Sequence, residues 1–555
     1  MTRPGRTVGR ATRDLGPRTT GAALRLAAAA SVVVPFAFLL ATYGWPLWTI
    51  VRRSFEGSSL RLVGDTLASA RIGRIAWQTT AQAALSTLVV LAVGIPAAYC
   101  HVRFRYPGRR AMWLAVAVPF VLPTVVVSAG LLAVVGSDGL GRGDAGSWLL
   151  VVVAHVAVNL AVVVRTVAGR LASIDPRLEE VARSLGRNRV RAACVVVGAA
   201  RDAIWGSAIL VFLFCLTSFG IVLVLGGGAV TTMEVEIWYQ STRILRLDAA
   251  AVLALAQMVV VVVVLVGYQR STRSRTRAPA RVAGPPRRPS SWPQRAFVAG
   301  CVLVEGALVL TPVVALVGRS LRVVDGWGLD HFRHLGSIPL GTSVNGSPLQ
   351  ALWNSLAIGL IAALVAVGVG VPAAIASVRR RRGARLLDAA LMLPLATSAA
   401  TVGFGILLAY RQPPFDLRGS VLAVPLVEAT IATPLVVRVL SPVLAALDRR
   451  QLDAAASLGA GGWRTLRVVV APVVAPVLGV AAALAFAVSL GEFGATAFLA
   501  RQDAPTLPQL IVRLLGRPGD ANVGQAMALG AVLVLCTAGV FGAVEALGRG
   551  RALEF

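Results

Sequence analysis

About 12 apolar runs, each long enough to cross a membrane, alternate with short polar segments along the 555 residues of this chain. Roughly 20 consecutive apolar residues let a helix span the core of a bilayer, and a helix satisfies its own backbone hydrogen bonds there. The predicted spans lie near residues 27–50, 77–100, 111–135, 147–166, 202–225, 248–268, 297–318, 351–376, 387–410, 421–440, 474–498 and 523–547. We therefore predict an all-α membrane protein of about 12 transmembrane helices, which places both chain ends on one side of the bilayer.

The composition excludes several other classes of protein. Hydrophobic residues make up 56% of the chain and charged residues 14%, whereas soluble domains are roughly 25% charged. The net charge is +29, but the arginines lie in short clusters between apolar runs, so we expect no nucleic-acid partner. The chain has no Lys and therefore no phosphate-binding P-loop, so we expect a pore subunit that is not itself an enzyme. Scattered Cys and His residues give no metal site, and we expect no cofactor.

Arginines in the short loops orient the chain, because such residues are concentrated on the cytosolic side. The cytosolic markers are Arg103, Arg105, Arg109 and Arg110 after the second span, and Arg379 to Arg382 with Arg385 after the eighth. The loop after the first span is a partial exception, since it carries Arg52, Arg53, Arg61, Arg71 and Arg74 on the external side. Both termini are then cytosolic. Abundant Arg, Ala, Val and Gly are typical of a GC-rich genome, and we expect a bacterial plasma membrane.

An internal repeat divides the chain into two similar halves. Glu180–Gly186 matches Asp453–Gly459 at an offset of 273 residues, and Phe219-Gly220 matches Phe493-Gly494 at 274. The offset drifts to 276 for Pro96 and Pro372, as loop insertions in a duplicated unit would cause. We predict a basic cytosolic tail, a first half, an Arg- and Pro-rich cytosolic linker, a second half and a short cytosolic tail, at residues 1–20, 21–268, 269–296, 297–547 and 548–555. With about six spans each, the halves are parallel and enclose one path.

Each half carries a matching segment in its longest cytosolic connection. Helix-forming residues run from Pro176 to Leu185 and from Ala445 to Leu458, and a glycine follows each run. A helix that ends in a left-handed glycine gives a helix, tight turn, helix arrangement. Small alanine faces on such helices allow close approach of a cytosolic partner. One such segment alone could equally be an amphipathic helix lying on the membrane, but two copies at equivalent positions favour partner docking.

These segments resemble the cytosolic coupling motif of type I ABC importer permeases. The matching residues are Glu180, Ala182 and Gly186 in the first half, and Asp453, Ala454, Ala455, Gly459 and Pro472 in the second. The first half departs from the motif, with Val181 in place of an alanine and no proline at its end, and the second has Asp453 for the usual Glu. The resemblance implies an ATP-binding cassette ATPase dimer that grips both segments, and an external solute-binding protein.

A second pair of segments follows the fifth span of each half. Ser218-Phe219-Gly220 in the first half corresponds to Glu492-Phe493-Gly494 in the second. Glycines that interrupt an apolar span permit unwound backbone where it lines a cavity. Ser218, Phe219, Glu492 and Phe493 are therefore our candidates for the translocation path. A carboxylate such as Glu492 would suit a cationic substrate, although attachment to a neighbouring helix or to Arg501 explains it equally well.

The fused, two-half form of the chain resembles permeases for thiamine and for ferric iron. The order of the Thr-Ser-Phe-Gly, Gly-Gly-Gly and Thr-Met-Glu-Val-Glu-Ile segments is closer to the thiamine type. This resemblance implies import of a small cationic solute or metal, with thiamine first and ferric iron second. The alternative is a gradient-driven secondary transporter, for which intramembrane carboxylates at Glu305, Glu428 and Glu492 would be the sign.

Overall fold

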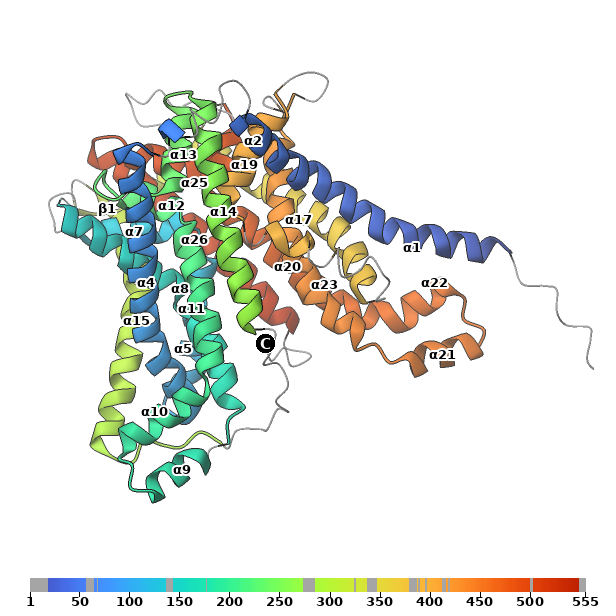
Figure 1. Ribbon diagram of the computed structural model, residues 1–555, viewed down its shortest axis with the longest axis horizontal. Coiled ribbons are helices and arrows are strands. Elements are labelled where there is room, and N and C mark those ends of the chain that lie inside the picture. Colours follow the sequence, from blue (N-terminus) through green and yellow to red (C-terminus); the bar gives the residue numbers. More distant parts are fainter. Residues whose placement is uncertain are drawn as a thin grey trace, which may run out of the picture.

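The protein is described by a computed structural model in which two bundles of helices lie side by side (Figure 1). It describes residues 18–55, 64–66, 68–135, 143–175, 177–272, 285–323, 326–336, 347–378, 387, 390–394, 397–411, 416–417, 420–499 and 503–548. Parts of both tails and of the linker, Arg61, the Arg379 to Arg382 cluster with Arg385, and Arg501 lie outside these residues.

All the regular elements described in the first half are helices. Its elements are α1 (Arg18–Leu39), the π-helical turn η1 (Leu40–Gly44), α2 (Trp45–Phe55), α4 (Ala70–Arg103), α5 (Arg109–Ala115), α6 (Val118–Val121), α7 (Thr124–Val135), α8 (Asp144–Ala172), α9 (Arg177–Ser184), α10 (Arg189–Ala199), α11 (Arg201–Leu216), α12 (Gly220–Leu225), α13 (Met233–Thr242) and α14 (Leu247–Thr272).

The second half repeats this order with one small addition, an antiparallel pair of two-residue strands after its first helix. Its elements are α15 (Trp292–Ser320), β1 (Arg322–Val323), β2 (Gly326–Trp327), α16 (Asp330–Arg333), the 3-10 turn η3 (His334–Gly336), α17 (Pro348–Val378), α19 (Ala399–Ala409), α20 (Ala423–Ala445), α21 (Arg449–Ser457), α22 (Gly462–Thr465), the π-helical turn η4 (Leu466–Val470), α23 (Ala471–Gly491), α24 (Thr496–Leu499), α25 (Leu507–Leu515) and α26 (Asp520–Gly548).

The all-α membrane architecture is confirmed, whereas the number of 12 spans is not. Among the described residues, nine helices are long and apolar enough to cross a membrane, or 11 if two bent helix pairs each count as one span. One bent pair, α5–α6 with α7, turns by 103° within the run 111–135. Leu122 precedes Pro123 there and is extended, as the residue before a proline prefers to be. Of the run 387–410, only part is described, and its helix is the short α19.

Two predicted spans are wrong as single helices. The run 202–225 breaks after Leu216, and the run 474–498 breaks after Gly491. A short helix follows each break, α12 in the first half and α24 in the second. Hydropathy does not reveal these breaks, because the residues around them are as apolar as the helices themselves. The breaks place Phe219 and Phe493 in irregular backbone at the ends of α11 and α23.

The repeat inferred from the sequence is also present in the packing. In the first half, α4 packs on α8 so closely that a Cβ on Gly94 would lie 2.7 Å from Val163. In the second half, α17 packs on α20, and a Cβ on Gly370 would lie 2.7 Å from Val436. These residues are equivalent, at offsets of 276 and 273. The same helix pair is therefore fixed by the same glycine-to-valine approach in both halves.

The first helix of each half packs on the opposite half. Helix α15 lies against α7, α4 and α5 of the first half, and α1 and α2 lie against α17 and α19 of the second. The two crossings are equivalent in detail, since Gly130 of α7 faces Pro312 of α15 and Gly405 of α19 faces Pro46 of α2. Neither half alone therefore holds its complete set of packing surfaces.

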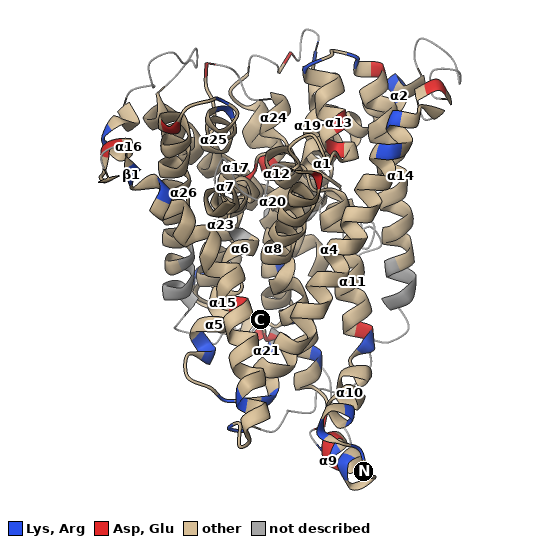
Figure 2. Ribbon diagram, turned by 90° about the vertical axis from the view of Figure 1, so that its left-hand side faces the viewer, with Lys and Arg blue, Asp and Glu red and all other residues tan. Residues whose placement is uncertain are grey.

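Charged residues gather at the two ends of the bundle, with a broad uncharged band between them (Figure 2). Two of the arginines that depart from the expected charge pattern have acidic partners. Arg53 lies 2.7 Å from Asp248 at the start of α14, and Arg71 lies 2.9 Å from Glu236 of α13. These ion pairs join α2 to α14 and α4 to α13.

Candidate coupling helices and translocation path

Helices α9 and α21 carry the predicted coupling residues and lie at the same end of the bundle (Figure 1). Both begin with a side-chain cap, because Asp175 accepts from the amide of Arg177 and Asp448 from that of Arg450, each at 2.9 Å. These aspartates are equivalent at the offset of 273. The sequence analysis missed them, although an Asp immediately before a helix is a recognised start signal.

Both helices end in a left-handed glycine, as expected. Gly186 has φ +82° and Gly459 has φ +75°. In each turn the glycine amide and the following amide bond back to the helix, the second of these being Arg187 to Ala182 at 3.1 Å and Ala460 to Ala455 at 2.9 Å. This is the Schellman pattern of hydrogen bonds. A Cβ on either glycine would meet no described atom within 4 Å, so the backbone conformation, not crowding, requires glycine there.

The predicted coupling residues are divided between the two faces of these helices. Glu180, Asp453 and Ala454 are exposed, Ala182 is buried, and Ala455 is half-buried. Leu185 and Leu458, each immediately before the glycine, are 78% and 87% exposed. A large apolar side chain so exposed at equivalent positions of a repeat indicates a surface that a partner covers. The sequence contained this signal as the shared Ser-Leu-Gly ending, but the leucines were not singled out.

The two coupling segments differ in how they join the following span. In the first half, α10 and α11 meet at a bend of 69° at Ala200. In the second half, residues Gly462–Gly491 form one continuous span, with the π-helical turn η4 immediately before Pro472. A proline lacks the amide that would continue the regular ladder, which accounts for the irregular turn beside it. The missing proline of the first half thus coincides with a different local geometry.

A charge cluster fixes α9 to the rest of the first half and to the linker. Glu179 Oε2 accepts from Tyr99 Oη at 3.2 Å and lies 3.8 Å from Arg103 Nε and 3.4 Å from Arg287 Nη2. Arg103 ends α4 and is only 5% exposed, while Arg287 belongs to the linker. Main-chain bonds of Arg287 to Arg103 and Arg105 hold the linker in place. In the second half the residue equivalent to Glu179 is Leu452, so this attachment exists in one half only.

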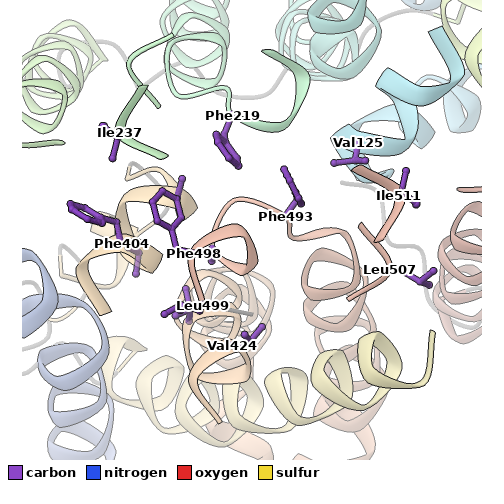
Figure 3. Packing of buried hydrophobic residues seen from close by; sticks show 14 of the residues in the cluster. Val125, Phe219, Ile237, Phe404, Val424, Phe493, Phe498, Leu499, Leu507 and Ile511 are labelled. Carbon is purple, nitrogen blue, oxygen red and sulfur yellow. The ribbon is translucent and has the colours of Figure 1, made fainter. Parts of the chain in front are cut away.

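The predicted path residues Phe219 and Phe493 meet at the boundary between the halves (Figure 3). Their rings stack with centroids 5.4 Å apart and planes 15° apart, and both side chains are buried. The ring of Phe498 is tilted against those of Phe219 and Phe404, with centroid distances of 6.3 Å and 5.8 Å. Phe219 and Phe493 lie just beyond the C-terminal ends of α11 and α23, and we call these two rings together with Phe498 the aromatic plug. Equivalent phenylalanines from the two halves therefore pack against each other.

The other two predicted path residues have backbone contacts. Glu492 Oε1 accepts from the amide of Ala495 at 3.2 Å and so caps the start of the short helix α24. The main-chain oxygen of Ser218 accepts from the hydroxyl of Thr232 at 3.3 Å. Both residues are partly buried and adjoin the aromatic plug. The contact of Glu492 with Arg501 falls outside the described residues.

Buried polar residues join helices to one another. His101 Nε2 of α4 lies 3.1 Å from Glu305 of α15, which ties the exchanged first helix to the other half. Tyr106, in the turn after α4, hydrogen bonds to His101 Nδ1 at 3.0 Å. Burial raises the pKa of Tyr106, so its phenol stays protonated. His155 contacts Ser86 at 3.2 Å. The contacts of His101, Glu305 and His155 are those of helix-to-helix hydrogen bonds.

Named transport permeases of bacteria are similar to all or part of this chain. The thiamine transport system permease protein ThiP of Brucella abortus (strain 2308) is 31% identical over 491 residues, covering 83% of this chain and 84% of that protein. ThiP of Escherichia coli (strain K12) is 28% identical over 458 residues, covering 78% and 82%. A putative 2-aminoethylphosphonate transport system permease protein, PhnV of Salmonella paratyphi A (strain ATCC 9150 / SARB42), is 33% identical over 216 residues, or 38% of this chain and 77% of that one. No family model matches the chain.

Proposed function

The chain belongs to the fused, two-half type I permeases of ABC importers, and from this membership we propose that it forms the membrane path of an ATP-driven importer for thiamine. Two of the relatives described above are named as thiamine transport permeases and are matched over more than three quarters of this chain. None of these three is named for iron, so thiamine is the solute that the similarities favour.

The coupling role of α9 and α21 rests on one observation above all. The two helices have equivalent aspartate caps, equivalent left-handed glycines and equivalent exposed leucines, and they lie at one end of the bundle. A partner with twofold symmetry would meet the same shape twice. An ATPase dimer is such a partner, and in this proposal each of its subunits receives one helix, with Leu185 or Leu458 at the centre of the contact.

Transport follows from a change in the distance between these two helices. When the ATPase dimer closes on nucleotide, it draws α9 and α21 together, and the halves turn about the central boundary. This rotation separates Phe219 from Phe493 and opens the path to the external side. The permease itself makes and breaks no covalent bond; hydrolysis takes place in the ATPase.

The remaining partners follow from the same assignment. A solute-binding protein delivers thiamine to the external face, where α13, α25 and the loops around them lie. The protein resides in the bacterial plasma membrane with both termini in the cytosol, and the linker that contains Arg287 is on the same side as α9.

Reconstitution tests the proposed function. The permease is placed in proteoliposomes with its cognate ATPase, and uptake of radiolabelled thiamine is measured with and without the binding protein and ATP. We expect uptake only when all components are present. Uptake of ferric iron instead of thiamine would show that iron is the substrate. Uptake driven by an ion gradient without the ATPase would establish the secondary-transporter alternative.

A further inference from the structure

A cavity of about 190 Å³ lies between the two halves. Its walls come from α14 of the first half and from Leu393, Thr397, Ser398 and Thr401 of the second, with Tyr43 and Leu47 of the exchanged first helix also lining it. Thr217 also lines it and immediately precedes Ser218 and Phe219. The cavity therefore adjoins the aromatic plug.

A carboxylate that faces this cavity has no cationic partner among the described residues. Glu234 of α13 is 0% exposed, and its Oε1 accepts from Gln257 Nε2 at 2.8 Å and from Thr401 Oγ1 at 3.4 Å. Its Oε2 and the amide oxygen of Gln257 form no hydrogen bond of normal geometry with any described residue. No ion pair joins Glu234 to a described Arg or His. By contrast, Glu236, two residues along α13, has Arg71 at 2.9 Å.

The equivalent helix crossing in the other half has no such polar cavity in its described residues, so the polar lining is not a feature that the duplication imposes on both halves. There the cavity measures only about 10 Å³ and is lined by proline, leucine and valine. Val309 takes the place of Tyr43 at an offset of 266, while Leu122 and Val126 take the places of Thr397 and Thr401 at an offset of 275. Pro508 takes the place of Glu234 at an offset of 274. One copy of a duplicated crossing is closed and apolar, and the other is open and acidic.

Burying an unpaired carboxylate is costly, and the cost is offset when a cation occupies the site. We propose that this cavity binds an organic cation, with Glu234 as the counter-charge, Gln257 and Thr401 as hydrogen-bonding groups, and Tyr43 as an aromatic wall for the cationic ring. The inference rests on the proposed function, since the thiazolium ring of thiamine is such a cation. It goes further by placing a solute site inside the permease, beside the plug and on one side of the pseudo-twofold axis only.

The test measures equilibrium binding to the permease–ATPase complex in nanodiscs made only of phosphatidylglycerol, which contain no lipid ammonium group. The probes are thiamine, a neutral thiophene analogue of the same shape, and tetramethylammonium. Glu234→Gln removes the charge and keeps the size. Glu236→Gln is the matched control, because it makes the same change on the same helix outside the cavity.

We expect Glu234→Gln to weaken thiamine binding by about 10- to 100-fold, the range for loss of a charged hydrogen-bonding partner. Glu236→Gln should bind as the wild type does, and the neutral analogue should bind weakly to all three proteins. Equal thiamine binding by wild type and Glu234→Gln overturns the inference, and so does the absence of binding of every cation to the wild type.

The proposed function has a separate readout in thiamine uptake. If the reconstituted wild type takes up no thiamine, the substrate assignment fails, and the cavity is then judged by tetramethylammonium alone. Binding of that ion that depends on Glu234 supports the site, and binding that does not depend on Glu234 overturns it.

Discussion

Phe219 and Phe493 occupy the same position in the two halves and stack on one another, with ring centroids 5.4 Å apart. Equivalent residues of a duplicated chain touch only where the pseudo-twofold axis passes between them. The contact therefore marks the axis, and in our proposal the central path follows this axis. A stacked aromatic pair closes such a path without unpaired polar groups, and it separates without breaking a hydrogen bond.

Removing one ring of this pair should destabilise the conformation in which the two halves are in contact through Phe219 and Phe493. We expect Phe219→Ala or Phe493→Ala to raise basal ATP hydrolysis by the reconstituted complex about 2- to 10-fold, because an aromatic pair contributes about 0.5–1.5 kcal/mol beyond the area that it buries. ATPase assays without binding protein measure this effect. Phe120→Ala is the control, since Phe120 of α6 is exposed and its ring lies against Phe214 rather than against the stacked pair. Unchanged basal hydrolysis in both path variants would show that the plug does not gate the transporter.

Charge on the exposed leucines should prevent ATPase docking. Leu185→Asp and Leu458→Asp each place a carboxylate in a contact that the proposal makes apolar. Because burying a charge there is costly, we expect each variant to weaken association with the ATPase about 10-fold or more. Co-purification with the tagged ATPase, followed by titration, measures this change. Leu329→Asp, at another exposed leucine, which precedes α16 at the end of the bundle opposite α9 (Figure 2), should leave association unchanged. Comparing the two coupling variants also measures whether the loops contribute equally.

The charge cluster around Glu179 should stabilise the first half specifically. Glu179→Gln leaves the buried Arg103 without its carboxylate partner. We expect the free energy of unfolding to fall by about 3 kcal/mol, the lower end of the range for breaking a buried ion pair. Thermal unfolding of the purified permease measures it. The double variant Glu179→Gln with Arg103→Gln should recover part of the loss, as a double-mutant cycle requires of interacting residues. Additive losses in the double variant would mean that the two side chains do not interact.

Exchange of the first helices makes a prediction about the separate halves. Because α15 packs on the first half and α1 and α2 pack on the second, fragments 1–272 and 285–555 should each aggregate when expressed alone. Expressed together, they should co-purify as a complex. Size-exclusion chromatography of the three preparations distinguishes these outcomes. A first-half fragment that is monodisperse without its partner would contradict the importance of the exchange.

The sequence predicted those features that depend on local or repeated signals. The ends of α9 and α21 followed from a glycine after a helix-forming run, and Phe219 and Phe493 emerged as a pair because the repeat aligned them. Gly220 and Gly494 indicated interrupted helices there, but the predicted spans still ran through the breaks after Leu216 and Gly491. A hydropathy window registers apolar residues and not their backbone conformation.

Features that depend on distant segments could not be obtained in this way. The contact of Glu179 with Arg287 joins residues 108 positions apart, and the hydrogen bond between Glu234 and Thr401 joins residues 167 apart. Neither pair has a spacing that a helix or a motif would impose. Both depend on how the halves pack, and the exchange of the first helices had no sequence signal that we recognised.

The central claim is that nucleotide binding brings two equivalent helices together. It is tested most directly by the distance between spin labels at positions 185 and 458, measured by electron paramagnetic resonance in the complete complex after the five native cysteines are replaced. The account predicts a shorter distance when a non-hydrolysable ATP analogue is bound than in its absence, with no shortening in complexes that lack the ATPase. An unchanged distance on nucleotide binding, in a complex that still transports thiamine, would contradict the account.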